Sequence, residues 1–166
     1  MILRLADPSD ADEIAAVGAL TVEAYLADGY LGGAEDGYVD HLRAAADRAR
    51  DAELAVAVDE GSGAVLGTVT YCRAGTPWAE VSRDGEAEFR MLAVAPTARG
   101  QGVGEALATW CIDRARADGC HAVVLSTLPG MHPAHRIDQR LGFVRTPVRD
   151  WYPEPDIQLI TYQLEL

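Results

Sequence analysis

A strand, a glycine-rich turn and a helix follow one another without interruption between residues 86 and 107. Residues 86–95 favour a strand that Pro96 ends, because proline cannot donate to the hydrogen bonds between strands. The turn at 99–104 reads Arg-Gly-Gln-Gly-Val-Gly, and the helix after it places apolar side chains on one face. The first turn of a helix carries unpaired N–H groups and partial positive charge, and glycines let phosphates approach the backbone. The segment therefore predicts a cradle for a phosphate or pyrophosphate.

Two better-known phosphate-binding loops do not match this turn. A P-loop closes with Gly-Lys and then Ser or Thr, and no such sequence closes this turn. A dinucleotide fingerprint places its first glycine directly after the strand, whereas residues 96–101 come before Gly102. The third glycine of that fingerprint would also fall on Leu107. The turn by itself indicates an anion site without naming the ligand.

The whole chain, residues 1–166, predicts one α/β domain, long enough to bury a core without metals or disulfides. Asp7 is expected to cap a first helix that begins at Pro8. Apolar periodicity predicts further helices at 36–51 and 134–141, and strands at 2–6, 54–58, 65–72, 122–125, 143–148 and 159–166. The element order is then β-α-α-β-β-β-α-β-α-β-β, which describes a mixed α/β fold.

The formal net charge of −12 limits the partners of this chain. Such an acidic surface repels phosphate backbones and argues against nucleic-acid binding, whereas a cationic amine would be attracted. Three cysteines without a CxxC pair favour reduced thiols over disulfides or zinc. The first residues lack the apolar run of a signal peptide, and no stretch approaches the roughly 18 apolar residues of a membrane span. We expect a cytoplasmic protein without membrane contacts, and its Ala, Gly, Arg and Asp content suggests a bacterial source.

A longer pattern surrounds the glycine turn. The strand fits the pattern Leu-x-Val-x-Pro at Leu92, Val94 and Pro96. The turn fits the pattern Gln/Arg-x-x-Gly-x-Gly/Ala at Arg99, Gly102 and Gly104. A later pattern, Ala-x-x-Leu-Tyr-x-x-x-Gly-Phe, is matched or conservatively substituted at Ala134, Ile137, Gly142 and Phe143. In these residues the chain resembles the GNAT superfamily of N-acetyltransferases. The resemblance extends over most of the chain and implies a GNAT-like fold, with a mixed, largely antiparallel central sheet flanked by helices.

The resemblance also implies an acetyl-CoA site. Backbone amides of the turn would hold the pyrophosphate, at Arg99, Gly100, Gln101, Gly102, Val103 and Gly104. The backbone of Leu92, Ala93 and Val94 would pair with the pantetheine arm like an added strand, beside a bulge that opens a slot for it. Ser126 and Thr127 would lie near the acetyl thioester.

Acetyl transfer to an amine needs a base that removes a proton and a donor that stabilises the oxyanion. Strand alternation predicts that Glu86, Glu88 and Arg90 point to one side, together with Leu92 and Val94. By position, Glu88 corresponds to a glutamate that many family members use as base or as anchor of a water chain. Glu86 is the second candidate base, and the backbone N–H of Leu92 is the expected oxyanion donor. The other interpretation of Glu88 is a solvated surface charge beside Arg90.

The expected acid departs from the family pattern. The family often places a tyrosine four residues before Gly-Phe, and this chain has Asp138 there. An aspartate of ordinary pKa is ionised at neutral pH and would repel a departing thiolate. The acid is then absent, replaced by water, or supplied by one of four other side chains, His132, His135, Tyr152 or Tyr162. Asp138 is alternatively a contact for a cationic acceptor.

These observations lead to one main hypothesis and two alternatives. The main one is transfer of an acetyl group from acetyl-CoA to a primary amine of unknown identity, without a metal, because no HExxH-type pattern occurs. The first alternative is a catalytically weak acyl-CoA-binding sensor or interaction module, motivated by Asp138. The second is transfer of a larger acyl group. A homodimer through the late strands is also expected from the resemblance.

Overall fold

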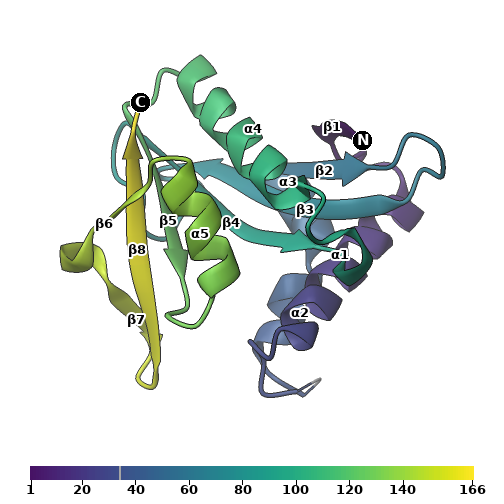
Figure 1. Ribbon diagram of the computed structural model, residues 1–166, viewed down its shortest axis with the longest axis horizontal. Helices are drawn as coiled ribbons and strands as arrows, with labels where there is room; N and C mark the ends of the chain where they lie inside the picture. The colour runs from purple at the N-terminus through teal and green to yellow at the C-terminus, as the bar shows by residue number, and fades with distance from the viewer. Residues whose placement is uncertain (34) are drawn as a thin grey trace. The chain divides into compact units, whose positions relative to one another are not determined.

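A computed structural model describes residues 1–33 and 35–166 and contains a mixed set of helices and strands (Figure 1). In chain order the elements are β1 (Ile2–Leu5), α1 (Ala11–Ala27), α2 (Tyr38–Arg43), α3 (Ala45–Asp51), β2 (Glu53–Val58), β3 (Val65–Arg73), β4 (Glu86–Val94), the 3-10 turn η1 (Pro96–Ala98), α4 (Val103–Ala117), β5 (Ala122–Thr127), α5 (His132–Arg140), β6 (Val144–Arg145), the 3-10 turn η2 (Pro147–Arg149), β7 (Trp151–Glu154) and β8 (Ile157–Glu165). The predicted α/β fold class is confirmed, since only β4 and β5 pair in parallel among the strand pairs described.

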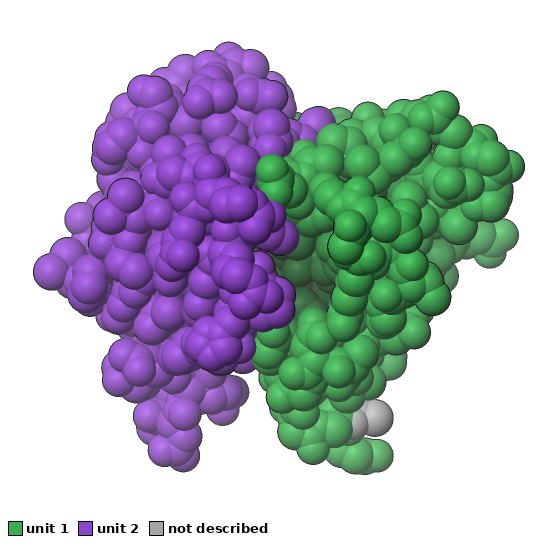
Figure 2. Space-filling model, viewed as in Figure 1, with its two compact units in different colours: residues 1–71, 91–107 green, residues 72–90, 108–166 purple. Residues whose placement is uncertain are grey.

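The contacts within the described residues divide the chain into two compact units (Figure 2). Unit 1 comprises residues 1–71 and 91–107, and unit 2 comprises residues 72–90 and 108–166. β4 and α4 each begin in one unit and end in the other. The expectation of a single domain over 1–166 stays a prediction.

Unit 1 contains an antiparallel sheet covered by helices. β2 pairs with β1 on one side and with β3 on the other, with Leu54 opposite Thr70. The inward side chains of β2 form a cluster with α1 and α3, in which Val17, Leu54 and Val56 are almost fully buried. Burial of these apolar side chains fixes α1 and α3 against the sheet.

The first helix begins later than the sequence predicted. Asp10, not Asp7, is its N-cap, and its carboxylate accepts hydrogen bonds from the N–H groups of Asp12 and Glu13 at 3.1 and 3.0 Å. Asp7 instead accepts from the N–H and hydroxyl of Ser9, at 2.8 and 2.6 Å. This local turn competes with helix formation, so the helix starts one turn downstream at Ala11.

The helix expected at 36–51 is interrupted at Ala44, which separates α2 from α3. The fully buried Arg48 donates from its guanidinium to the Leu42 carbonyl at 2.9 Å, so this side chain forms a hydrogen bond with a carbonyl oxygen in the last turn of α2. α1 also passes close to the break, because a Cβ added at Gly18 would lie 2.6 Å from the Arg43 carbonyl oxygen. Tertiary contacts therefore replace the continuous helix that the apolar spacing indicated.

Unit 2 is built on the strand order β4-β5-β8-β6, with β7 also pairing with β8. The buried strand β5 runs parallel to the start of β4, with Glu88 opposite Val124. The strand expected at 143–148 is only two residues long, because Pro147 begins η2. The β7–β8 hairpin was not predicted, since Pro153 lies within β7 and proline argues against a strand except at an edge.

Candidate functional site

The glycine turn of unit 1 has the backbone that its sequence indicated. Gly100 and Gly102 have φ values of 74° and 80°, a left-handed conformation that glycine adopts without steric cost. No atom of the described residues lies within 4 Å of a Cβ built on either glycine. α4 begins directly afterwards, and its first hydrogen bond beyond the turn joins the Ala106 N–H to the Gly102 carbonyl at 2.9 Å. The amides at the start of α4 have no partner within their own helix.

Two side chains of this turn form hydrogen bonds within unit 1. Arg99 donates to both carboxylate oxygens of Asp28, at 2.7 and 3.1 Å, at the end of α1. The amide of Gln101 donates to the Thr97 carbonyl at 3.2 Å. These contacts leave the backbone of the turn, rather than its side chains, as the part suited to an anion.

β4 changes its backbone conformation where it passes from unit 2 to unit 1. Met91 has a φ of 51°, the only positive value among the described non-glycine residues. A left-handed residue within a strand bends it and interrupts its pairing, which is the property of a bulge. The regular two-residue alternation predicted from Glu86 to Val94 is therefore not maintained at Met91. Leu92 and Val94 are half-buried, and Ala93 packs on Leu20 of α1.

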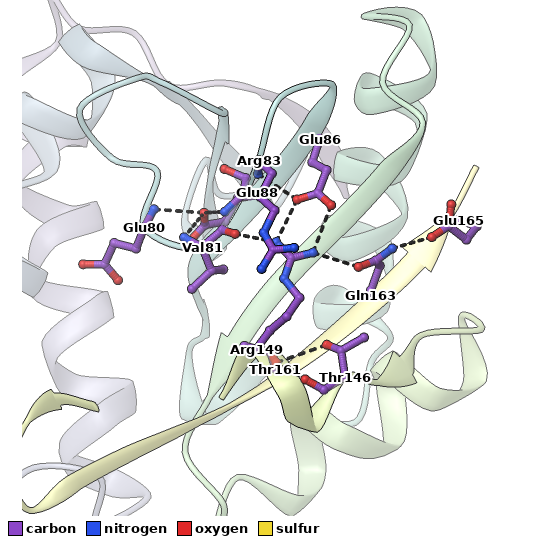
Figure 3. Close-up of polar contacts among 11 residues, drawn as sticks. Glu80, Val81, Arg83, Glu86, Glu88, Thr146, Arg149, Thr161, Gln163 and Glu165 are labelled. Atoms are coloured by element: carbon purple, nitrogen blue, oxygen red, sulfur yellow. Dashed lines mark hydrogen bonds and ion pairs between the residues drawn. The ribbon is translucent and has the colours of Figure 1, made fainter. Parts of the chain in front are cut away.

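Glu88 lies in unit 2 with a fully buried side chain, which excludes the interpretation as a solvated surface charge. Its Oε2 atom accepts three hydrogen bonds, from the backbone N–H groups of Glu80, Val81 and Ser82, each at 3.0 Å. Figure 3 shows the contacts with Glu80 and Val81. Its Oε1 atom is buried and has no hydrogen-bond partner among residues 1–33 and 35–166. One carboxylate oxygen therefore holds the loop before β4, and the other is buried beside it without a hydrogen bond from the described residues.

Glu86, the second candidate base, is fully engaged. Both of its oxygens accept from Arg149, at 2.9 and 2.8 Å, and its Oε2 also accepts from the Arg83 N–H at 2.7 Å (Figure 3). Burial alone would raise the pKa of Glu86, but the hydrogen bonds from Arg149 and Arg83 outweigh it and lower that pKa. Arg149 also donates to the Val81 carbonyl. The pair thus anchors the loop that binds Glu88, and no local sequence pattern points to Arg149.

The two hydroxyl residues at the end of β5 also have partners within unit 2. Ser126 Oγ accepts from the indole N–H of Trp151 at 3.0 Å. Thr127 Oγ1 lies 3.3 Å from His135 Nε2, which is also 3.1 Å from the Leu128 carbonyl. Burial lowers the pKa of His135, so its imidazole is neutral at pH 7. α5 is thereby fixed against the end of β5.

The expectation that Asp138 is ionised at neutral pH is wrong for this environment. Asp138 faces the interior from α5 with 4% of its surface exposed. Loss of solvation raises the pKa of Asp138 to about 7. A large fraction of this carboxyl group is therefore protonated at neutral pH, and electrostatic repulsion does not exclude it as an acid.

The other acid candidates differ in exposure. Tyr152 on β7 is 59% exposed, whereas Tyr162 on β8 is buried. The Tyr162 ring lies 5.5 Å from the His135 ring and has the Arg145 guanidinium 5.4 Å from its centre. His132 packs edge-on against His135 at 5.8 Å. Tyr162 and His135 are thus packed together, and Tyr152 lies at the surface.

The described residues also bear on metal binding and on membrane crossing. No group of three or more His, Cys, Asp or Glu side chains is arranged to hold a metal ion there. None of the helices in residues 1–33 and 35–166 is both long and apolar enough to cross a membrane.

The sequence and the fold together define the family. The model of the acetyltransferase (GNAT) family matches residues 20–143. The chain therefore belongs to the GNAT acetyltransferase family, and an acyltransferase is the class of enzyme that its sequence and fold define. No curated protein matches the chain.

Solved structures share the fold over nearly their whole length. Ribosomal-protein-alanine N-acetyltransferase from Brucella melitensis is 22% identical, with a TM-score of 0.71 and 100% of each chain covered. The protein yncA from Salmonella typhimurium, solved with its cofactor acetyl-CoA, is 25% identical, with a TM-score of 0.69, covering 100% of this chain and 94% of that one. A GNAT acetyltransferase from Staphylococcus aureus Mu50 is 12% identical, with a TM-score of 0.74, covering 99% and 98%.

Proposed function

We propose that this protein is an N-acetyltransferase that transfers an acetyl group from acetyl-CoA to a primary amine. The observation that carries the proposal is the state of Glu88. Its carboxylate is fully buried, one oxygen is held by three N–H donors, and the other has no partner in the described part of the chain. A positioned carboxylate with one free oxygen suits a general base.

The glycine turn supports acetyl-CoA as the acyl donor. Open space above Gly100 and Gly102 suits the approach of a pyrophosphate to the amides from Arg99 to Gly104. Acetyl-CoA is the cofactor present in the Salmonella typhimurium structure. When bound, acetyl-CoA supplies the activated thioester. The backbone of Leu92, Ala93 and Val94 would hold its pantetheine arm beside the Met91 bulge, with Ser126 and Thr127 near the thioester.

In this proposal, Glu88 and Leu92 have separate roles in the reaction. Glu88 receives the proton that leaves the acceptor's nitrogen, and the Leu92 N–H stabilises the negative charge that develops on the acetyl oxygen. The acceptor is an amine, favoured by the net charge of −12. The structures that share the fold include enzymes with protein substrates, such as the Brucella melitensis protein, and at 22% identity this likeness selects no acceptor.

The competing proposal is a catalytically weak acyl-CoA sensor. Asp138 at the usual tyrosine position favours it, because a sensor does not need an efficient acid. We further propose a cytoplasmic bacterial protein, in line with its three free cysteines, that forms a homodimer through its late strands. Light scattering of the purified protein measures the mass of that assembly.

Calorimetric titration with acetyl-CoA tests the donor site. We expect micromolar binding by the natural protein and its loss in Gly104→Glu, whose carboxylate would repel the pyrophosphate. Gly61→Glu is the matched control, since it adds the same charge in the turn between β2 and β3, with only the Asp59 side chain within 4 Å of the added Cβ. No binding by a folded sample would contradict the proposal.

Release of CoA, followed with a thiol reagent over a panel of primary amines, then separates enzyme from sensor. Blanks without amine correct for the protein's own cysteines, of which Cys72 and Cys111 are buried. Turnover with at least one amine supports the transferase. Tight binding of acetyl-CoA with no turnover on any amine supports the sensor.

A further inference from the structure

The glycine turn of unit 1 is anchored to the end of α1 by its first side chain. The Arg99 guanidinium donates from two nitrogens to the two carboxylate oxygens of Asp28, at 2.7 and 3.1 Å. Its Nη2 atom also donates to the Ala24 carbonyl oxygen at 3.4 Å, in the last turn of the same helix. A bidentate contact between arginine and a carboxylate is among the stronger and more directional polar contacts in proteins. The turn is therefore joined to a helix end 71 positions away in the sequence.

The end of α1 has no cation of its own. Its last turn contains no basic residue, although the carboxyl end of a helix carries partial negative charge. Asp28, the C-cap of α1, adds a full negative charge at the same place. The Arg99 guanidinium supplies the positive charge that this helix end favours. The helix and the carboxylate thus both stabilise the position of Arg99.

The turn needs such an anchor because its own residues lie at the surface. Ala98 and Val103 on either side of it are buried, whereas residues 99–102 are all exposed. Two of these four residues are glycines with positive φ values, and glycine has more backbone freedom to lose than any other residue. Binding of Arg99 to α1 restricts this segment before a ligand arrives. A restricted turn loses less conformational entropy when a pyrophosphate binds its amides.

α1 also contacts the strand next to the turn. Ala93 of β4 forms a buried cluster with Leu20 and Ala24 of α1, and Ala95 packs against this cluster. Ala24 thus takes part in both contacts, through its packing with Ala93 and through its carbonyl bond to Arg99. The strand proposed for pantetheine and the turn proposed for pyrophosphate are therefore supported by one helix.

We propose that Asp28 is a positioning residue for the acyl donor, because it binds Arg99 and so holds the turn at 99–104 in the conformation whose amides bind the pyrophosphate. This inference rests on the proposed function, in which the turn is the acetyl-CoA site. Asp28 acts through Arg99 and does not touch the donor. The alternative is that Arg99 binds a phosphate directly and Asp28 competes with it. The geometry favours positioning, since both carboxylate oxygens and the helix end already engage the guanidinium.

The two roles predict opposite effects of removing Asp28, and calorimetric titration with acetyl-CoA separates them. Asp28→Ala should bind acetyl-CoA more weakly by roughly three- to tenfold, because the turn loses its anchor. Arg99→Ala should lose a similar factor, and the double variant should lose no more than Arg99→Ala, since both changes break the same contact. Asp28→Glu keeps the carboxylate and should recover most of the affinity. Unchanged or tighter binding by Asp28→Ala would overturn the proposal.

Kinetics with an amine found in the screen provide a second measurement. The KM for acetyl-CoA should rise in Asp28→Ala with kcat close to that of the natural protein, because the bound donor meets the same reacting groups. A merely structural aspartate would lower the stability without changing this KM. Both side chains are partly exposed, Asp28 by 34% and Arg99 by 39%, so either is removed without opening the core. A fall in kcat at natural KM would contradict the positioning role.

Asp40→Ala is the matched control. It removes the same charge from an aspartate of unit 1 whose side chain is 96% exposed, and it should bind acetyl-CoA as the natural protein does. Equal changes of affinity in Asp40→Ala and Asp28→Ala would assign the effect to net charge and overturn the proposal. A natural protein that does not bind acetyl-CoA would reject the proposed function and this inference with it. Natural binding beside an unaffected Asp28→Ala rejects only the role of Asp28.

Discussion

Arg149 donates to both carboxylate oxygens of Glu86, at 2.9 and 2.8 Å, although 63 positions separate the two residues in the sequence. Both side chains are buried, with 7% and 6% of their surface exposed. The same guanidinium donates to the Val81 carbonyl in the loop that binds Glu88. A structural ion pair thereby supports the residue that we propose as the base.

Breaking the pair between Arg149 and Glu86 should lower the stability of the protein. Arg149→Met leaves the Glu86 carboxylate buried without its cation, and we expect a loss of about 3–5 kcal/mol in the free energy of unfolding. Urea denaturation measures it. Adding Glu86→Gln to Arg149→Met removes the stranded charge and should recover part of the loss. A single variant within about 0.5 kcal/mol of the natural protein would show that the pair does not stabilise this fold.

Glu88→Gln should abolish most activity and preserve the fold. The glutamine carbonyl oxygen can accept the three N–H groups of residues 80–82, but the side chain cannot take a proton at neutral pH. We expect the rate of CoA release to fall by roughly 100- to 10,000-fold. Glu60→Gln, which removes an exposed carboxylate paired with the N-terminus, is the matched control. Equal rates in the two variants would contradict the role of Glu88.

Asp138 should make stability depend on pH. Its pKa is raised from 3.8 to about 7, so the folded protein binds a proton that the unfolded chain has released between these values. Stability from this group is therefore complete below about pH 4 and falls as the pH rises to 7, by roughly 4 kcal/mol at most.

Asp138→Asn tests that dependence, because asparagine does not titrate. From pH 4 to pH 8 the natural protein should lose unfolding free energy relative to the variant. Urea denaturation across that range measures the difference. A difference that is constant with pH would mean that Asp138 keeps an ordinary pKa.

Gly67→Ala should destabilise unit 1. An added Cβ would lie 2.9 Å from the Ala93 carbonyl oxygen and from Val103 Cγ1, and 3.1 Å from Leu107 Cδ1. We expect a loss of about 1–3 kcal/mol, since backbone and packed helix must shift. Gly130→Ala is the control, because none of the described atoms lies within 4 Å of its added Cβ. Similar melting temperatures for both variants would show that the contact at Gly67 relaxes without cost.

The glycine turn and its flanking elements could be predicted from sequence because their causes are local. A left-handed turn needs glycines at particular positions, and Gly100 and Gly102 supply them. The buried β5 was also predictable, from its nearly continuous apolar residues. The family pattern followed from the same segments, and the match over residues 20–143 agrees with it.

Errors in the element boundaries arose where local preferences compete. Asp7 and Asp10 are both suitable N-caps. Because Asp7 forms a turn with Ser9, Asp10 caps the helix. The apolar spacing of 36–51 fits one helix, but Arg48 bonds to the Leu42 carbonyl and the chain breaks at Ala44. Spacing alone carries no information about which distant side chain will occupy a carbonyl.

The sequence by itself determined the fold class, the family and the turn that we propose for acetyl-CoA, because each depends on residues close together in the chain. Only the tertiary structure decided the state of the candidate catalytic groups. It buries Glu88 with one carboxylate oxygen bound to the loop before β4, pairs Glu86 with Arg149, and desolvates Asp138 until its pKa is about 7. Charge state depends on solvation and on partners from distant parts of the chain, and folding alone supplies both.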